Sequence, residues 1–212
     1  MARKDILEVV KTALDSPKRN FTEGVDLAIN LQNVDMSKPQ NRIDEDVILP
    51  SGFGKPVKIA IFASGELAVK AKNAGADLIL SPDQIEKLGK NKPGAKSIVN
   101  EYDFFLADAS LMPAIGKNLG PVLGPPGKMP RPITSTVNIA TIIEKLRKTV
   151  RIRSKDKTTF HVAVGCKTMS PEEIAANVEV IIKQLESKLE KGTNNIHSIY
   201  VKTTMGSATR VI

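Results

Sequence analysis

Gly127 and Lys128 form the residue pair that ends a phosphate-binding loop, in which backbone amides and a lysine hold the phosphates of a nucleotide. That loop also needs a glycine five positions before Gly127 and a serine or threonine after Lys128. Val122 and Met129 occupy those positions, so the hydroxyl that would hold Mg²⁺ is absent. The segment 62–66, which follows an expected strand, lacks the glycine spacing of a dinucleotide site. Neither segment predicts nucleotide binding.

The chain contains few cysteine and histidine residues that could act as a nucleophile or bind a metal ion. Cys166 is the only cysteine, and His161 and His197 are the only histidines. A nucleophile needs a base within hydrogen-bond reach, but an extended strand would carry Cys166 away from His161. The acidic residues favour helix starts and solvated helix faces and form no catalytic pair. We therefore expect no enzyme, no metal site and no cofactor.

A run rich in glycine and proline spans 119–132 and holds three glycines and five prolines. Proline fixes φ and glycine permits close approach of the backbone, so this loop can be stiff and still present its amides. Together with Gly127, the cations Lys117, Lys128 and Arg131 could lie against phosphates. The alternative is a stiff structural connection. The residues alone leave both interpretations open.

Two segments, 159–164 and 198–204, alternate in the manner of half-buried strands. One face of the predicted sheet is apolar, and the other is rich in hydroxyls. The second face carries Thr159, His161, Ser198, Tyr200, Lys202 and Thr204. A neutral face of this kind suits the 2′-hydroxyls of RNA. The alternative is an ordinary solvent-exposed face.

The pattern of elements predicts two domains, one α/β and one α+β. Strand-like and helix-like segments alternate over 57–156, ending in a strand at 149–153, and this favours an inserted Rossmann-like α/β domain. The ends predict helices at 5–13, 22–31 and 170–191, and strands at 42–49, 159–164 and 198–204. Neither end has enough strands to close a core alone. We therefore expect a discontinuous α+β domain made of 1–56 and 157–212.

The charge is unevenly distributed over these expected domains. The whole chain has 31 basic and 23 acidic side chains, a net charge of +8. The insert 57–156 has 16 basic and 9 acidic side chains, a net charge of +7, which leaves +1 for the two ends together. Such an excess favours a polyanionic partner. No apolar run reaches the ~20 residues of a membrane span, and the N-terminal segment lacks a signal-peptide core, so we expect a cytosolic protein and no membrane.

Three sequence motifs resemble one known family. They are Leu-Pro-Ser-Gly-Phe-Gly-Lys at 49–55, Leu-Gly-Pro-Pro-Gly-Lys-Met-Pro at 123–130 and Thr-Thr-Met-Gly at 203–206. Together they resemble the L1 family of ribosomal proteins, which lies in the mobile stalk of the large subunit beside the tRNA exit site. The resemblance covers essentially the whole chain, and Arg-Asn-Phe-Thr-Glu at 19–23 is similar to the archaeal members.

The resemblance implies which residues contact RNA. It places rRNA and mRNA contacts at Phe21, Asp26, Ser198, Thr204, Met205 and Gly206, to which the hydroxyl-rich face adds His161. Gly206 would allow RNA to approach the backbone closely. Gly24 and Ala208 stand where bacterial members often carry Thr and Ser, so no side-chain hydrogen bond to RNA is expected from them. Lys117, Gly127, Lys128 and Arg131 are expected as further RNA contacts.

The resemblance also implies a function. It predicts a structural constituent of the large ribosomal subunit that binds stalk rRNA, assists the release of deacylated tRNA from the exit site and represses translation of its own mRNA by binding the leader. It further implies a cytoplasmic, ribosome-bound protein that is a monomer when free. The alternative is a free RNA-binding regulator or chaperone that never enters the ribosome.

Overall fold

A computed structural model describes residues 3–17, 19–134 and 138–212 of the chain. The chain divides into two compact units, Met1–Lys55 with Lys148–Ile212 and Pro56–Arg147. Both units combine helices and sheets, as the α/β and α+β fold class requires. We call them the composite unit and the inserted unit.

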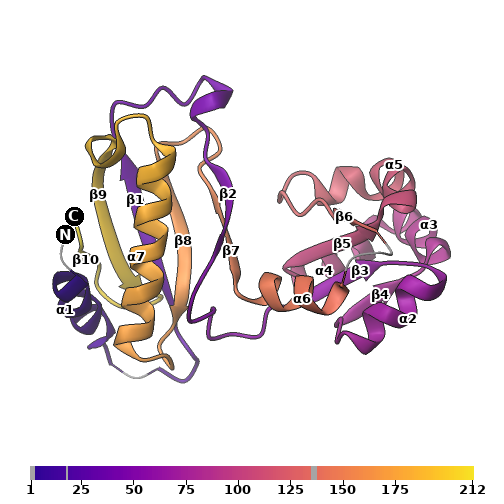
Figure 1. Cartoon of the computed structure of the whole chain (residues 1–212), viewed down its shortest axis with the longest axis horizontal. Helices are drawn as coiled ribbons and strands as arrows, with labels where there is room; N and C mark the ends of the chain where they lie inside the picture. The colour runs from indigo at the N-terminus through magenta and orange to yellow at the C-terminus, as the bar shows by residue number, and fades with distance from the viewer. Residues whose placement is uncertain (1–2, 18, 135–137) are drawn as a thin grey trace. The chain divides into compact units, whose positions relative to one another are not determined.

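The composite unit is built on a four-stranded antiparallel sheet in the order β10-β9-β1-β8. Its strands are β1 (Gly24–Leu31), β8 (Thr159–Cys166), β9 (Ile196–Thr203) and β10 (Thr209–Arg210). The central strand β1 comes from the N-terminal part of the chain, and its neighbours come from the C-terminal part (Figure 1). The two ends of the chain therefore form one core.

Two helices cover one face of this sheet. They are α1 (Arg3–Leu14), which contacts β9, and α7 (Pro171–Lys188), which contacts α1 and β8 and lies along the sheet in Figure 1. Ser170 begins α7 with a capping box, because its Oγ accepts the N–H of Glu173 at 3.3 Å and the Glu173 carboxylate accepts the N–H of Ser170 at 2.9 Å. Burial of apolar side chains between helices and sheet is the main stabilising contribution.

Most of the segment 22–31 forms strand β1 (Gly24–Leu31), so the helix predicted there is wrong. The apolar residues of this segment fit a helical stripe over so short a window, but their burial alternates along the strand. Val25, Leu27, Ile29 and Leu31 are buried and the residues between them are half-buried. Pairing with β8 on one side and β9 on the other satisfies the backbone of this segment. Tertiary context has overridden the local pattern.

The predicted strand at 149–153 exists, but it lies in the composite unit. Strand β7 (Thr149–Arg153) pairs antiparallel with β2 (Asp44–Ile48) in a two-stranded ribbon. The second boundary therefore falls between Arg147 and Lys148, rather than after residue 156. Residues 148–156, with four basic and one acidic side chain, therefore belong to the composite unit, and the inserted unit has 12 basic and 8 acidic side chains and a net charge of +4. The composite unit also has a net charge of +4, from 19 basic and 15 acidic side chains.

The remaining elements of the composite unit are short 3₁₀ turns. They are η1 (Pro39–Asn41) and η3 (Gly192–Asn195). Asn195 in η3 is buried, and its side chain accepts the N–H of Lys191 and donates to the carbonyl of Gln32. This turn thereby joins the end of β1 to the start of β9.

The inserted unit contains a parallel sheet in the order β4-β3-β5-β6. Its strands are β3 (Ile59–Phe62), β4 (Leu78–Leu80), β5 (Phe104–Asp108) and β6 (Arg131–Ile133). Its helices are α2 (Gly65–Asn73), α3 (Pro82–Lys90), α4 (Lys92–Glu101), α5 (Met112–Leu123) and α6 (Ile139–Arg147), with a 3₁₀ turn η2 (Ala109–Leu111) before α5. Phe62 and Phe105 stack within the core beneath α3, α4 and α5.

The first part of the glycine- and proline-rich run 119–132 is helical. Helix α5 continues to Leu123 although Pro121 lies inside it. Its buried residues Ile115, Leu119 and Leu123 recur at intervals of four, which places them on one face against the core. The interpretation of the whole run as a loop is therefore wrong.

Candidate nucleic-acid interface

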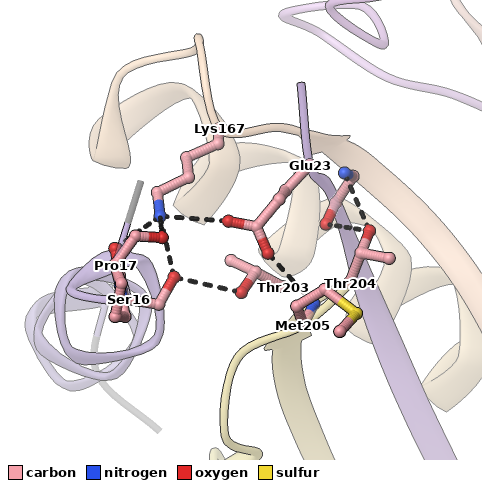
Figure 2. A network of polar contacts seen from close by, with 8 residues as sticks. Ser16, Pro17, Glu23, Lys167, Thr203, Thr204 and Met205 are labelled. Carbon is pink, nitrogen blue, oxygen red and sulfur yellow. Dashed lines mark hydrogen bonds and ion pairs between the residues drawn. The ribbon is translucent and has the colours of Figure 1, made fainter. Parts of the chain in front are cut away.

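Four segments of the composite unit, residues 16–17, 23–24, 167 and 203–205, meet where β1 begins and β9 ends (Figure 2). The backbone N–H of Thr204 donates to the carbonyl of Gly24 at 3.0 Å. The Thr204 hydroxyl accepts the N–H of Gly24 at 3.1 Å and donates to the Gly24 carbonyl at 3.3 Å. A hydroxyl has one proton and two lone pairs. Thr204 is exposed and retains one lone pair, so it can accept a hydrogen bond from outside.

A buried carboxylate holds the turn that follows Thr204. The side chain of Glu23 is only 1% exposed, and its Oε1 accepts the N–H of Met205 at 3.0 Å. Its Oε2 accepts from the ammonium of Lys167 at 3.1 Å. The N–H of Met205 and the Lys167 ammonium hold the pKa of the Glu23 carboxyl below its usual value, although burial acts in the opposite direction. Glu23 is therefore ionised at neutral pH.

The ammonium of Lys167 joins this carboxylate to the end of α1. It donates to the carbonyl of Ser16 at 2.6 Å, to the Ser16 Oγ at 2.8 Å and to the Pro17 carbonyl at 3.4 Å, in addition to Glu23. Its own backbone N–H donates to the carbonyl of Glu23 at 3.0 Å. Figure 2 shows the resulting network from Pro17 to Thr204. The network fixes residues 16–17, 23–24, 167 and 203–205 relative to one another.

Gly206 is required by the protein itself. A Cβ at this position would collide with the Oγ1 of Thr203, a buried residue whose hydroxyl lies 3.3 Å from the Ser16 Oγ. The N–H of Gly206 also donates to the carbonyl of Thr203 at 3.2 Å, which closes the turn. Close approach of RNA remains a prediction for this glycine, but the turn already excludes a side chain.

Large apolar side chains are exposed beside this polar network. Phe21 is 54% exposed and Met205 is 59% exposed. Phe21 forms part of an open hollow whose lining is Arg19, Asn20, Phe21, Thr22, Glu23, Lys167 and Thr168. An exposed aromatic ring surrounded by hydrogen-bonding groups is typical of a surface on which nucleic-acid bases stack.

The other predicted residues of the sheet lie on the face away from the helices. Asp26 on β1 lies opposite Lys202 on β9, and His161 on β8 is exposed opposite Ala28. Ser198 lies farther along β9 and is buried. Its hydroxyl accepts from the Asn30 amide at 2.8 Å, and the Asn30 side chain in turn accepts from the Thr159 hydroxyl at 2.8 Å. The structure therefore places Phe21 with Thr204–Gly206, and His161 and Ser198 elsewhere on the sheet.

In the inserted unit, three of the four predicted contacts, Gly127, Lys128 and Arg131, interact within the protein. The ammonium of Lys128 donates to the carbonyls of Val99 and Tyr102 at 2.8 and 2.7 Å, where it stabilises the end of α4. The N–H groups of Gly127 and Lys128 donate to the carbonyls of Gly124 and Leu123. These amides are thus not presented to a ligand. Arg131 lies over the ring of Phe104 at 5.6 Å, and Lys117 is exposed on α5.

Metal ligands, membrane spans and Cys166 are the remaining features that bear on other chemistry. Within that part, no group of three or more His, Cys, Asp or Glu side chains could hold a metal ion. Nor is any described helix both long and apolar enough to span a bilayer. Cys166 is buried, with its Sγ 2.9 Å from the Thr168 hydroxyl, and His161 is exposed farther along the same strand.

Sequence reasoning missed Glu23 and Lys167. Both lie near recognisable residues, but a glutamate and a lysine in a basic chain are usually solvated. The signal that could have found Glu23 is its position inside the Arg-Asn-Phe-Thr-Glu segment, between Phe21 and the first residue of β1. Lys167 carries no comparable signal, because only the fold brings it to Ser16 and Glu23.

The chain is similar over its full length to ribosomal proteins of several archaea. The chain is 59% identical to the large ribosomal subunit protein uL1 of Methanocella arvoryzae over 213 residues, covering 100% of both chains. It is 52% identical to the uL1 of Methanosarcina barkeri, again over 100% of both, and 50% identical to that of Methanothermobacter thermautotrophicus over 99% of this chain and 100% of the relative. Residues 9–207 match the ribosomal protein L1p/L10e family. The chain therefore belongs to this family of ribosomal proteins, in its archaeal branch, and not to a family of enzymes.

Proposed function

We propose that the chain is a structural constituent of the large ribosomal subunit and that it binds rRNA with the composite unit. The relatives named as large ribosomal subunit proteins support the assembly. The observation that supports the binding surface is the edge at Phe21, Glu23 and Thr204–Gly206, where Phe21 and Met205 are exposed and the Thr204 hydroxyl retains a free lone pair. We call these residues the RNA edge.

The chemistry of the RNA edge favours recognition of local RNA structure. Because Thr204 donates its only proton to Gly24, the group it binds must be a donor, such as a ribose 2′-hydroxyl. A phosphate oxygen cannot fill that role. Phe21 offers a ring to an unpaired base, and such stacking tolerates any base. Affinity from these contacts depends on shape more than on net charge.

We also propose that the chain contacts tRNA and regulates its own translation. The inserted unit, with its net charge of +4, is suited to looser, salt-sensitive contacts with exit-site tRNA as that tRNA is released. Because the RNA edge reads local structure, the leader of the protein's own mRNA would compete for it by presenting the same structure. Repression of translation then needs rRNA to bind more tightly, and a tenfold preference corresponds to only about 1.4 kcal/mol.

One pair of variants tests the RNA edge directly. Phe21→Ala removes the exposed ring, and Ile48→Ala removes a side chain of the same 54% exposure from the β2–β7 ribbon. Loss of a stacked base costs about 1–3 kcal/mol, so Phe21→Ala should weaken binding of a large-subunit rRNA fragment by about 5- to 150-fold. Ile48→Ala should leave binding unchanged. Equal behaviour of the two variants would contradict the placement of the RNA edge.

Co-sedimentation decides between the ribosomal role and the free regulator or chaperone. The tagged protein should sediment with large subunits through a salt wash, and the Phe21→Ala variant should be lost from them first. A protein that remains at the top of the gradient while bound to other RNA would support the alternative.

A further inference from the structure

Two lysines flank the RNA edge, and their surroundings differ. Lys167 lies behind the edge with its side chain 22% exposed, and Lys55 lies on the surface at the end of the 49–55 segment. Both carry the same charge, so sequence alone would treat them as equivalent candidates for a phosphate. Their hydrogen bonds distinguish them.

Lys167 has no proton left for a ligand. An ammonium has three N–H donors, and the Lys167 ammonium lies within hydrogen-bond distance of four protein oxygens on Ser16, Pro17 and Glu23. Turning toward RNA would leave the Glu23 carboxylate buried without its counter-ion, which is costly. Its charge therefore neutralises Glu23 and keeps the turn at Met205 in place.

The ammonium of Lys55, in contrast, is available to a ligand. Its ammonium lies 3.6 Å from the position that a Cβ on Gly24 would occupy, and the Thr204 Oγ1 lies 3.7 Å from the same point. The ammonium and the hydroxyl thus flank Gly24 on the same edge. Within residues 3–17, 19–134 and 138–212, no hydrogen bond or ion pair engages the Lys55 side chain, which is exposed.

The backbone of the 49–55 segment holds Lys55 beside Gly24. Gly52 and Gly54 have φ values of +70° and +72°, which L side chains rarely adopt, and a Cβ on Gly54 would collide with the Sγ of Cys166. The fully buried Asn177 of α7 donates to the carbonyl of Gly52 at 2.9 Å and accepts the N–H of Ser51 at 3.2 Å. The segment is therefore anchored on the core just before its lysine.

We propose that Lys55 binds a phosphate of the RNA whose ribose hydroxyl reaches Thr204, and that Lys167 is a positioning residue which contacts no RNA. This rests on the proposed binding of rRNA at the RNA edge. A phosphate oxygen satisfies the free ammonium of Lys55, while the neighbouring Thr204 accepts from a donor such as the 2′-hydroxyl. The edge would then read a phosphate and a sugar hydroxyl together.

The salt dependence of binding separates the two roles. Each phosphate neutralised by a cation contributes about 0.7–0.9 to the slope of log K against log salt concentration. We would measure binding of a large-subunit rRNA fragment between 50 and 200 mM KCl for the full-length protein and for Lys55→Met, Lys167→Met and Lys183→Met. Lys183 is the matched control, since it is an exposed lysine of α7 paired with Glu179.

Lys55→Met should reduce the slope by about 0.7–0.9 and weaken binding about five- to eightfold at 0.1 M salt, with an unchanged melting temperature. Lys55→Arg should restore the slope. Lys167→Met should weaken binding and lower the melting temperature without changing the slope, and Lys183→Met should change neither. An unchanged slope in Lys55→Met, or a reduced one in Lys167→Met, would overturn the assignment. Absence of rRNA binding by the unsubstituted protein would instead overturn the proposed function.

Discussion

Replacing Thr204 by valine tests the RNA edge at a single oxygen. Valine keeps the shape of threonine but removes the hydroxyl that accepts the N–H of Gly24 at 3.1 Å and donates to its carbonyl at 3.3 Å. The Gly24 carbonyl keeps its bond from the N–H of residue 204, so the loss within the protein is confined to the Gly24 N–H. Because this N–H is near the surface, water can replace the lost partner.

These contacts determine how much stability and how much RNA affinity Thr204→Val should lose. The protein should lose about 0.5–1.5 kcal/mol of unfolding free energy, which corresponds to a melting temperature lower by about 2–4 °C per kcal/mol for a chain of this size. In the complex, the RNA donor that faces Thr204 is buried and would be left unpaired. That costs about 1–3 kcal/mol, or about 5- to 150-fold in affinity.

The assay combines fluorescence anisotropy of a labelled rRNA fragment with thermal melting by circular dichroism. Thr204→Ser is the control, because it keeps the hydroxyl and removes only the methyl group. We expect Thr204→Ser to bind within a few-fold of the unsubstituted protein and Thr204→Val to bind much more weakly. If the two variants bind equally well, or if the loss of affinity is no larger than the loss of stability, the hydroxyl does not contact RNA.

Two further predictions concern stability. Asn177→Leu removes an amide that bonds three backbone groups in the core, and it should lower the free energy of unfolding by about 3–5 kcal/mol; a urea midpoint close to that of the unsubstituted protein would contradict this account. Hydrogen bonds from Arg151 lower the pKa of Asp44 from its ordinary value of 3.8, so the pair stabilises the fold above that pH and loses its contribution as the pH falls through the lowered pKa. Asp44→Asn should therefore reduce stability at neutral pH and flatten its decline below pH 4, and parallel acid titration curves for the two proteins would count against the prediction.

Much of the element pattern followed from local chemistry. The serine, proline and glutamate at 170–173 predict the start of α7 because they satisfy the free N–H groups of its first turn. The alternation of 198–204 predicts a strand because its apolar residues recur with period two. The family was recognisable from three short motifs, each of which contains a glycine and two of which also contain proline, residues that restrict or permit particular backbone paths. These features depend on neighbours in sequence.

Other features depend on neighbours in space. Residues 24–31 form a strand because β8 and β9 pair with its two edges. Strand β7 belongs to the composite unit because it pairs with β2. All three pairings join segments more than 100 residues apart, so a local sequence pattern cannot predict them.

Some features of the RNA edge could be predicted from the sequence, and others depend on the tertiary structure. Its exposed members Phe21, Thr204 and Met205 and the half-buried Gly206 lie in motifs that the sequence displays, since turn geometry and surface chemistry restrict residue types locally. Lys55 lies in such a motif as well, but only its position beside Gly24 separates it from Lys167. Burial of Glu23 and the saturation of the Lys167 ammonium arise where α1, β1, β8 and β9 converge. The sequence determines which side chains are charged and can form hydrogen bonds. Only the tertiary structure determines whether their partners lie within the protein or whether they remain available to a ligand.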